Sequence, residues 1–242
     1  MSYDLTKFKH GLEELNITLT DKQTEQFLQY YEMLVEKNKV MNLTGITEYE
    51  EVIQKHFLDS LSLIRVISDI DSQKLTVIDL GTGAGFPGLP LKIAFPELEI
   101  TLMDSLNKRI LFLQEVIDAL GLKKVSAVHG SAEEMAANAA HRQQYDLCVS
   151  RAVSNLAVLT EYCLPFVKKG GLFVSYKSAD SDAEIQEGKK AISILGGKLT
   201  TVDKFQLPDS DLGRALVCIK KVKDTPKKYP RKAGTPAKLP LK

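Results

Sequence analysis

From residue 75 onwards, short apolar runs alternate with stretches of helical periodicity, and this alternation restricts the possible folds more than any other feature. The runs with the length of strands are residues 75–80, 99–104, 125–129, 146–150, 171–176, 199–205 and 215–219. Helical patterns fill most of the gaps between them. This order favours right-handed crossovers and a mainly parallel sheet covered on both faces. Only a loop joins the last two runs, so we expect the final strand to be antiparallel.

The chain before residue 71 has helical periodicity instead. Two pairs, Thr20 with Gln23 and Thr47 with Glu50, have the spacing of a capping box at the start of a helix. We therefore predict three parts. They are an N-terminal helical subdomain at residues 1–70, an α/β domain at 71–221 and a basic tail at 222–242. The Lys, Pro and Gly content of the tail predicts an extended segment without regular structure.

Charge and cysteine content restrict the partners and the compartment. Residues 220–242 carry nine Lys or Arg and one acid, so the remaining 219 residues have a net charge of −7 within a chain of net charge +1. A basic tail on an acidic body suggests a polyanionic partner, and a solvated tail is the plainer alternative. Three scattered cysteines argue against disulfides and a zinc site. With no signal peptide and no membrane-spanning run, we expect a cytoplasmic protein.

A glycine-rich turn follows the first predicted strand. Residues 77–88 read VIDLGTGAGFPG, in which Gly81, Gly83 and Gly85 alternate with other residues. A glycine lets a ligand lie against the backbone, because no side chain blocks the approach. Residues 83–88 also match the dinucleotide pattern G-x-G-x-x-G, which alone is a weak signal. The turn therefore predicts a cofactor site, with the cofactor still open.

Asp79 favours S-adenosylmethionine over a nicotinamide dinucleotide as that cofactor. A strand-end carboxylate would repel a pyrophosphate, whereas it suits a ligand with an ammonium group and no phosphates. Pro87 and Pro90 also crowd the helix start, where N–H groups would otherwise meet phosphate. The fold class we expect is thus a Rossmann-like, seven-stranded S-adenosylmethionine-dependent methyltransferase fold with an N-terminal helical extension.

Other strand ends are expected to meet at the same rim. Asp104 ends the second strand and can accept both ribose hydroxyls, although it could equally cap the following helix. The loop 130–133, which includes Ala132 and Glu133, is placed to contact adenine. Arg151 follows the fourth strand, where the transferred group would sit, and a surface ion pair is its alternative.

The absence of certain catalytic residue types limits which atoms this protein could methylate. The position after the fourth strand reads Ser150-Arg151-Ala152-Val153, without the Pro-Pro-aromatic loop typical of amine methylation. Cys148 and Cys163 are expected in the core rather than as nucleophiles. Guanine N7 fits what remains, because it has a lone pair and no proton, so no general base is needed. The spacing of His56 and Asp59 could imitate a metal pair, but helix packing or capping is the expected role.

Several motifs resemble one family over nearly the whole chain, ribosomal RNA small subunit methyltransferase G, also called glucose-inhibited division protein B. They are NLTGI at 42–46, HFLDSL at 56–61, DLGTGAGFPG at 79–88, DSLNKR at 104–109, SRA at 150–152 and KYPRKAGTP at 228–236. The resemblance implies N7 methylation of one guanine in the 530 loop of 16S rRNA. It places cofactor contacts on Gly81, Phe86, Ala132, Glu133 and Arg151.

The same resemblance makes the basic residues candidates for RNA contact. Three lie in the α/β domain, namely Lys108, Arg109 and Arg214. The local charge of the tail adds four basic candidates there, Lys227, Lys228, Arg231 and Lys232. Tyr229 is a further candidate, because its ring could stack on an exposed base. A strap docked on the acidic body is the alternative for the tail.

Two other functions stay open at this point. They are a nicotinamide-dependent oxidoreductase on the same fold and a non-catalytic RNA-binding module. For the leading hypothesis, the expected partner is 16S rRNA or the small ribosomal subunit, and the protein is expected to be a monomer without metal.

Overall fold

A computed structural model describes residues 3–151 and 153–241, and its centre is one seven-stranded sheet in the order β3-β2-β1-β4-β5-β7-β6. The strands are β1 (Thr76–Leu80), β2 (Glu99–Asp104), β3 (Val125–His129), β4 (Tyr145–Arg151), β5 (Val167–Ser178), β6 (Gly197–Gln206) and β7 (Gly213–Lys221). The strands β1 to β5 pair in parallel, whereas β7 pairs antiparallel with both β5 and β6. The predicted fold class and the antiparallel final strand are both confirmed.

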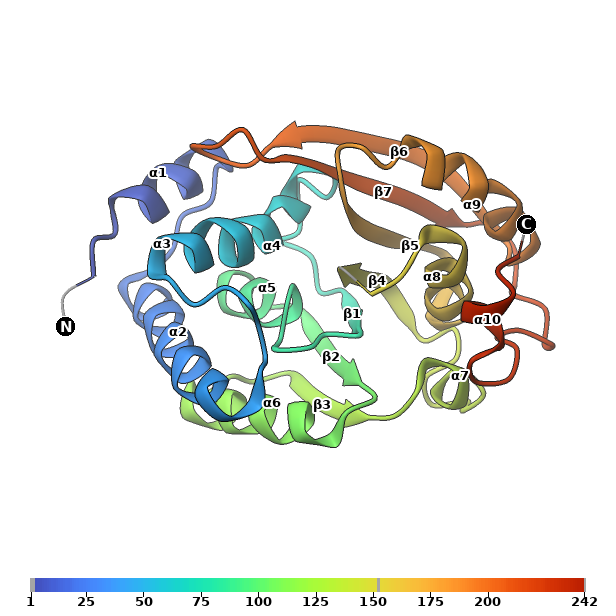
Figure 1. The fold of residues 1–242 in the computed structure, drawn as a ribbon, viewed down its shortest axis with the longest axis horizontal. Coiled ribbons are helices and arrows are strands. Elements are labelled where there is room, and N and C mark those ends of the chain that lie inside the picture. The colour runs from blue at the N-terminus through green and yellow to red at the C-terminus, as the bar shows by residue number, and fades with distance from the viewer. Residues whose placement is uncertain (1–2, 152, 242) are drawn as a thin grey trace.

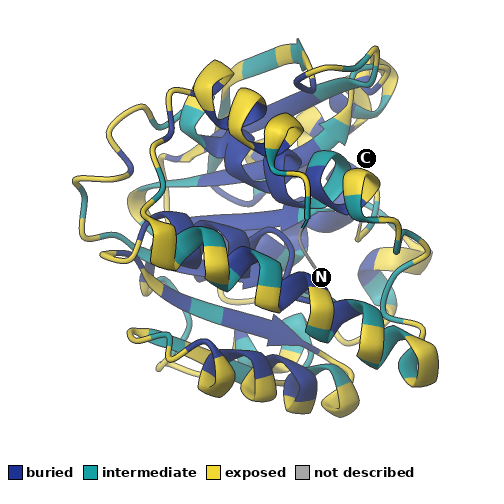
Figure 2. Ribbon diagram, turned by 90° about the vertical axis from the view of Figure 1, so that its left-hand side faces the viewer, coloured by how far each residue is buried: buried dark blue, intermediate teal, exposed yellow. Residues whose placement is uncertain are grey.

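Helices cover both faces of this sheet. They are α1 (Thr6–Glu14), α2 (Asp21–Met41), α3 (Tyr49–Val52), η1 (Ile53–Leu58), α4 (Asp59–Leu61), η2 (Ser62–Arg65), α5 (Gly88–Ala94), α6 (Asn107–Ala119), α7 (Ala132–Met135), α8 (Leu156–Cys163), η3 (Leu164–Phe166), α9 (Asp182–Ile194) and α10 (Thr235–Lys238). The helices α1 to α6 pack on one face, and α7 to α9 on the other (Figure 1). Figure 2 shows the buried strands between helices whose outer surfaces are exposed.

The N-terminal helices share their hydrophobic core with the sheet. One cluster of buried side chains runs from Phe8 and Phe27 to Leu102 and Val174. The capping box of Thr20 and Gln23 is present at the start of α2. The one predicted at Thr47 is wrong, because the helix begins later, at Tyr49, and has no side-chain cap. The three-part division stays a prediction, since this core crosses its first boundary.

The C-terminal segment departs from the extended, irregular tail that its composition predicts. It contains the short helix α10, and the Tyr229 side chain packs in the second core cluster with residues of α8 and α9. Figure 1 shows α10 beside α8 and close to α7. The expectation failed because composition does not reveal the anchoring contacts that this segment makes with the body. None of the helices described is both long and apolar enough to cross a membrane.

Candidate functional site

The glycine-rich turn connects β1 to α5 and is held from below by Asp79. Its Oδ2 accepts hydrogen bonds from Thr82 Oγ1 at 2.6 Å and from the Gly88 amide at 2.8 Å. A Cβ on Gly88 would lie 2.8 Å from the same oxygen, so glycine is required there. Gly83 differs, since its φ is +62° and an added Cβ would meet no atom within 4 Å. The turn therefore fixes its own shape through Asp79 and leaves open space over Gly83.

A cavity of about 400 Å³ lies at the carboxyl ends of β1, β2 and β3. We call it the strand-end cavity. Its lining is Leu80, Gly81, Met103, Asp104, Ser105, Arg109, Gly130, Ser131, Ala132, Glu133, Val153 and Tyr162. The parallel order of the three strands brings these loops together, as is usual for ligand sites in open α/β sheets.

Asp104 is the central acid of the strand-end cavity. It is 3 % exposed, and its carboxylate accepts from the Gly83 amide at 3.0 Å and from the Leu106 amide at 2.9 Å. Arg109 forms an ion pair with it at 3.1 Å. Asp104 therefore fixes the backbone just before α6, but α6 itself has no side-chain cap, so the helix cap weighed as the alternative is not observed. The carboxylate also lines the cavity.

A second cavity, of about 370 Å³, lies between the N-terminal helices and the sheet. We call it the helix–sheet cavity. It is lined by Ile46, Lys55, His56, Asp59, Arg151, Tyr176, Lys177, Ser178 and Arg214. The almost buried Asp59 holds two cations there, with Oδ2 at 2.8 Å from Arg151 Nη1 and Oδ1 at 3.2 Å from Arg214 Nε. Charged side chains from distant parts of the chain therefore build this cavity.

Arg151 also links the helix–sheet cavity to the glycine turn. Its guanidinium lies 5.1 Å from the centre of the Phe86 ring, and the His56 ring stacks on the same Phe86 at 4.4 Å. Burial, followed by the charge of Arg151, lowers the pKa of His56 to about 3. A neutral His56 can accept from Arg151 Nη2, 3.2 Å from its Nδ1, while its Nε2 lies 2.9 Å from Thr44 Oγ1.

The family model for rRNA small subunit methyltransferase G matches residues 23–213. The chain belongs to this family. It is 56% identical over 238 residues to ribosomal RNA small subunit methyltransferase G of Lachnoclostridium phytofermentans, covering 98% of both chains. The protein of the same name from Alkaliphilus metalliredigens is 53% identical over 234 residues, or 97% of both chains. Membership of this methyltransferase family gives no support to an oxidoreductase or to a non-catalytic RNA-binding module.

Solved structures support the fold. TrmN from Thermus thermophilus superposes with a TM-score of 0.52 over 70% of this chain and 53% of its own, at 14% identity. At that identity the likeness concerns the fold alone, and it agrees with a Rossmann-like sheet. The family assignment of this rRNA methyltransferase G chain therefore depends on the sequence matches.

The structure brings some of the candidate cofactor residues into one cavity. Gly81, Asp104, Ala132 and Glu133 line the strand-end cavity. Arg151 lines the helix–sheet cavity instead. The others lie in or below the glycine turn, outside both linings; they are Asp79, Gly83, Gly85 and Phe86. Asp79 is fully buried under the turn rather than at an open strand end.

The candidate RNA-contacting residues fall into two groups, exposed side chains and side chains that are paired or buried. Lys108, Lys227, Lys228 and Lys232 are exposed. Arg109 and Arg214 are engaged with Asp104 and Asp59. Tyr229 is only 8 % exposed and packs in the second core cluster, so in this structure it is not available to stack on a base. Arg231 is paired with the buried Glu161 at 2.6 Å, so it is not a free cation either.

Sequence reasoning missed the part that His56 and Asp59 play. They do pack helices against the sheet, as expected, but they also form a wall of the helix–sheet cavity. Their spacing on one helix gave a signal, since both side chains face the same way. The partners Arg151 and Arg214 lie more than ninety residues away, so sequence spacing alone could not reveal them.

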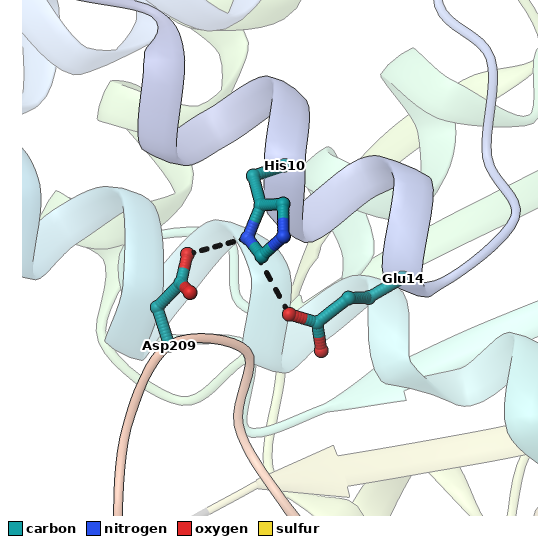
Figure 3. A group of neighbouring side chains, drawn as sticks. All are labelled: His10, Glu14 and Asp209. Atoms are coloured by element: carbon teal, nitrogen blue, oxygen red, sulfur yellow. Dashed lines mark hydrogen bonds and ion pairs between the residues drawn. The ribbon is translucent and has the colours of Figure 1, made fainter.

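Among the described residues, one cluster with metal-ligand chemistry lies outside both cavity linings. Figure 3 shows His10 with Glu14 and Asp209, all exposed, where His10 Nδ1 lies 2.8 Å from Asp209 Oδ2. The hydrogen bond and charge of Asp209 raise the pKa of His10. The contact joins α1 to the loop between β6 and β7. We interpret it as a surface ion pair.

Proposed function

We propose that this chain methylates N7 of one guanine in the 530 loop of 16S rRNA, using S-adenosylmethionine bound in the strand-end cavity. Two features of the glycine turn beside the cavity fit that cofactor. The space over Gly83 is open to a ligand, and Asp79 Oδ1 is a buried acceptor without a partner among the described residues. When bound, S-adenosylmethionine would supply an electrophilic methyl group.

The cavity lining and the glycine turn beside it can each be assigned to a different part of such a cofactor. Asp104 accepts the ribose hydroxyls on this view, and the loop with Ala132 and Glu133 lies against adenine. The carboxylate of Asp79 stabilises the ammonium group from beneath the turn. Gly81, Gly85 and Phe86 shape the path between them. The volume of the cavity, about 400 Å³, and its position at the strand ends support this arrangement.

The helix–sheet cavity is the place that we assign to the target guanine. Arg151 lies at the tip of β4, and Val153, two residues on, lines the strand-end cavity, so the two cavities are neighbours. His56 is neutral near pH 7, and both oxygens of Asp59 are engaged by arginines. No free carboxylate therefore serves as a base among the lining residues described. This single observation favours N7, whose lone pair needs no proton removed.

The RNA backbone would contact the exposed cationic side chains. We assign phosphate contacts to Lys108 near the strand-end cavity and to Lys227, Lys228 and Lys232 of the tail, with Arg109 and Arg214 at the cavity walls. Such contacts make affinity depend on salt. We also propose that the protein acts in the cytoplasm as a monomer and needs no metal.

The test uses small ribosomal subunits from a strain that lacks this enzyme. The protein and labelled S-adenosylmethionine are added, and mass mapping of the RNA locates the methyl group. We expect label on N7 of a single guanine in the 530 loop. Label on another atom or another nucleotide would overturn the proposed target, and no binding of S-adenosylmethionine would overturn the proposed cofactor.

A further inference from the structure

The C-terminal segment is attached to the body by a buried ion pair. The guanidinium of Arg231 donates to both carboxylate oxygens of Glu161, at 2.9 and 2.6 Å, and the Arg231 amide donates to the same acid at 2.8 Å. The Glu161 side chain is fully buried. A carboxylate placed on the inner side of α8 must be paired, because an unpaired buried charge is strongly destabilising.

Arg142 connects the same segment to the loop that follows β3. Its Nη1 donates to the Ala136 carbonyl at 3.0 Å and to the Tyr229 carbonyl at 2.9 Å, and its Nη2 donates to the Thr225 carbonyl at 3.0 Å. Ala136 ends the short helix α7, whose first residue, Ala132, lines the strand-end cavity. One guanidinium therefore holds the end of α7 and the C-terminal segment together.

The segment also reaches the wall of the strand-end cavity directly. The Gly234 amide donates to Glu133 Oε1 at 3.3 Å. Next to Glu161 on α8, Tyr162 lines the same cavity. Burial raises the pKa of the Tyr162 hydroxyl, and the Glu133 and Glu161 carboxylates add to the increase, which places both acids near its ring. Residues 225–238 thus contact Glu133, which lines the cavity, and they also contact α8, which carries the lining residue Tyr162.

We propose that residues 234–238, which residues 225–233 anchor to the body, are a positioning element for the cofactor: through Glu133 they hold the segment 130–135 in the conformation that contacts adenine. This inference rests on the proposed cofactor, and it assigns the docked tail a role in the binding of S-adenosylmethionine. The sequence pattern implied RNA contacts by the tail, with a strap docked on the acidic body as the alternative. The hydrogen bonds of Arg142 and the contact between Gly234 and Glu133 instead connect the tail to the wall of the cofactor pocket.

The experiment compares the full chain with a truncation after Ala233. The truncated chain keeps the Tyr229 and Arg231 anchors, but loses the Gly234 contact and α10. A full-length control, Lys227→Ala with Lys238→Ala, removes the same number of Lys residues from the tail and leaves the Arg142 hydrogen bonds and the Gly234 contact in place. Calorimetry measures the Kd for S-adenosylmethionine, and steady-state assays on small subunits separate KM from kcat.

We expect the truncation to raise both the Kd and the KM for S-adenosylmethionine about tenfold, within the usual range of coupling between sites. At saturating cofactor its kcat should stay near that of the full chain, and the control should bind the cofactor normally. Hydrogen exchange should be faster at the amides of residues 131–136 in the truncated chain, while the sheet stays protected. This exchange measurement also covers a truncated chain that is too unstable for calorimetry.

Two results would overturn the inference. One is an unchanged Kd with unchanged exchange at residues 131–136. The other is a rise in the KM for RNA alone that the double lysine control reproduces, because this would identify the tail as an RNA clamp. If the full chain itself binds no S-adenosylmethionine, the proposed function fails instead, so the two failures are distinguishable.

Discussion

The two cavities lie side by side, but they are built in different ways. The ends of three parallel strands and the turns that follow them supply most of the lining of the strand-end cavity, including Gly81 and Gly130. Side chains form the helix–sheet cavity, where Asp59 joins Arg151 to Arg214 across the core. A site made by backbone is lost when a side chain fills it, whereas a site made by charges is lost when one partner is removed.

The largest expected effect is the loss of cofactor binding when a side chain is added at Gly83. This variant tests whether the cofactor site depends on open space beside the backbone. Gly83→Val should abolish binding of S-adenosylmethionine, because the new side chain would occupy the open space over the turn. The left-handed backbone also costs a β-branched residue about 1–2 kcal/mol of stability. Calorimetry measures the binding, and urea unfolding measures the stability.

Gly121 offers a matched control for this variant. It has the same φ of +62° and equally open surroundings, but it follows the far end of α6. Gly121→Val should lose similar stability and bind the cofactor normally. If both variants lost binding to the same extent, backbone strain would explain the loss, and the open space over Gly83 would have no special role.

The next effect concerns the charges of the helix–sheet cavity. Asp59→Ala should lower the free energy of unfolding by about 3 kcal/mol, because it leaves two largely buried cations without their shared partner. Asp203→Ala is the control, since it removes a more exposed pair with Arg65 and should cost under about 1 kcal/mol. Equal losses in the two variants would show that burial does not distinguish these networks.

Sequence patterns predict the first kind of cavity better than the second. The strand β2 was predicted with its observed bounds, and the glycine turn was recognised, because strand periodicity and glycine spacing are local signals. The Asp59 network was not foreseen, since its members are far apart in sequence. The docked tail was missed for the same reason, as the acid that holds Arg231 lies within the largely apolar helix α8.

Arg151 lines the helix–sheet cavity and lies 5.1 Å from the Phe86 ring of the glycine turn, so a variant there should affect catalysis and binding differently. We expect Arg151→Ala to lower turnover roughly tenfold or more, since misplacement of a substrate costs such factors. Cofactor affinity should fall only modestly, because Arg151 is not part of the strand-end lining. Single-turnover methylation at saturating cofactor measures the first effect, and calorimetry the second. Unchanged single-turnover methylation would remove Arg151 from any positioning role.

The smallest effect concerns Asp79, a titratable group buried beneath the glycine turn beside the strand-end cavity. Burial raises the pKa of its carboxyl from 3.8 to about 7, partly offset by the hydrogen bonds from Thr82 and Gly88. The folded chain therefore holds a proton that the unfolded chain would release. The resulting stabilisation is full below about pH 4 and is lost as the pH rises through about 7.

A cationic ammonium group close to Asp79 would favour its ionised form, so binding of S-adenosylmethionine should release about half a proton at pH 7. Calorimetry in buffers of different ionisation enthalpy measures that release, and affinity should rise between pH 6 and pH 8. In Asp79→Asn, whose amide oxygen can still accept from Thr82 and Gly88, both effects should disappear while the fold persists. Release that is unchanged in the asparagine variant would mean that another group titrates. No release in the wild type would mean that Asp79 only holds the glycine turn, and that the strand-end cavity recognises its ligand without a buried charge.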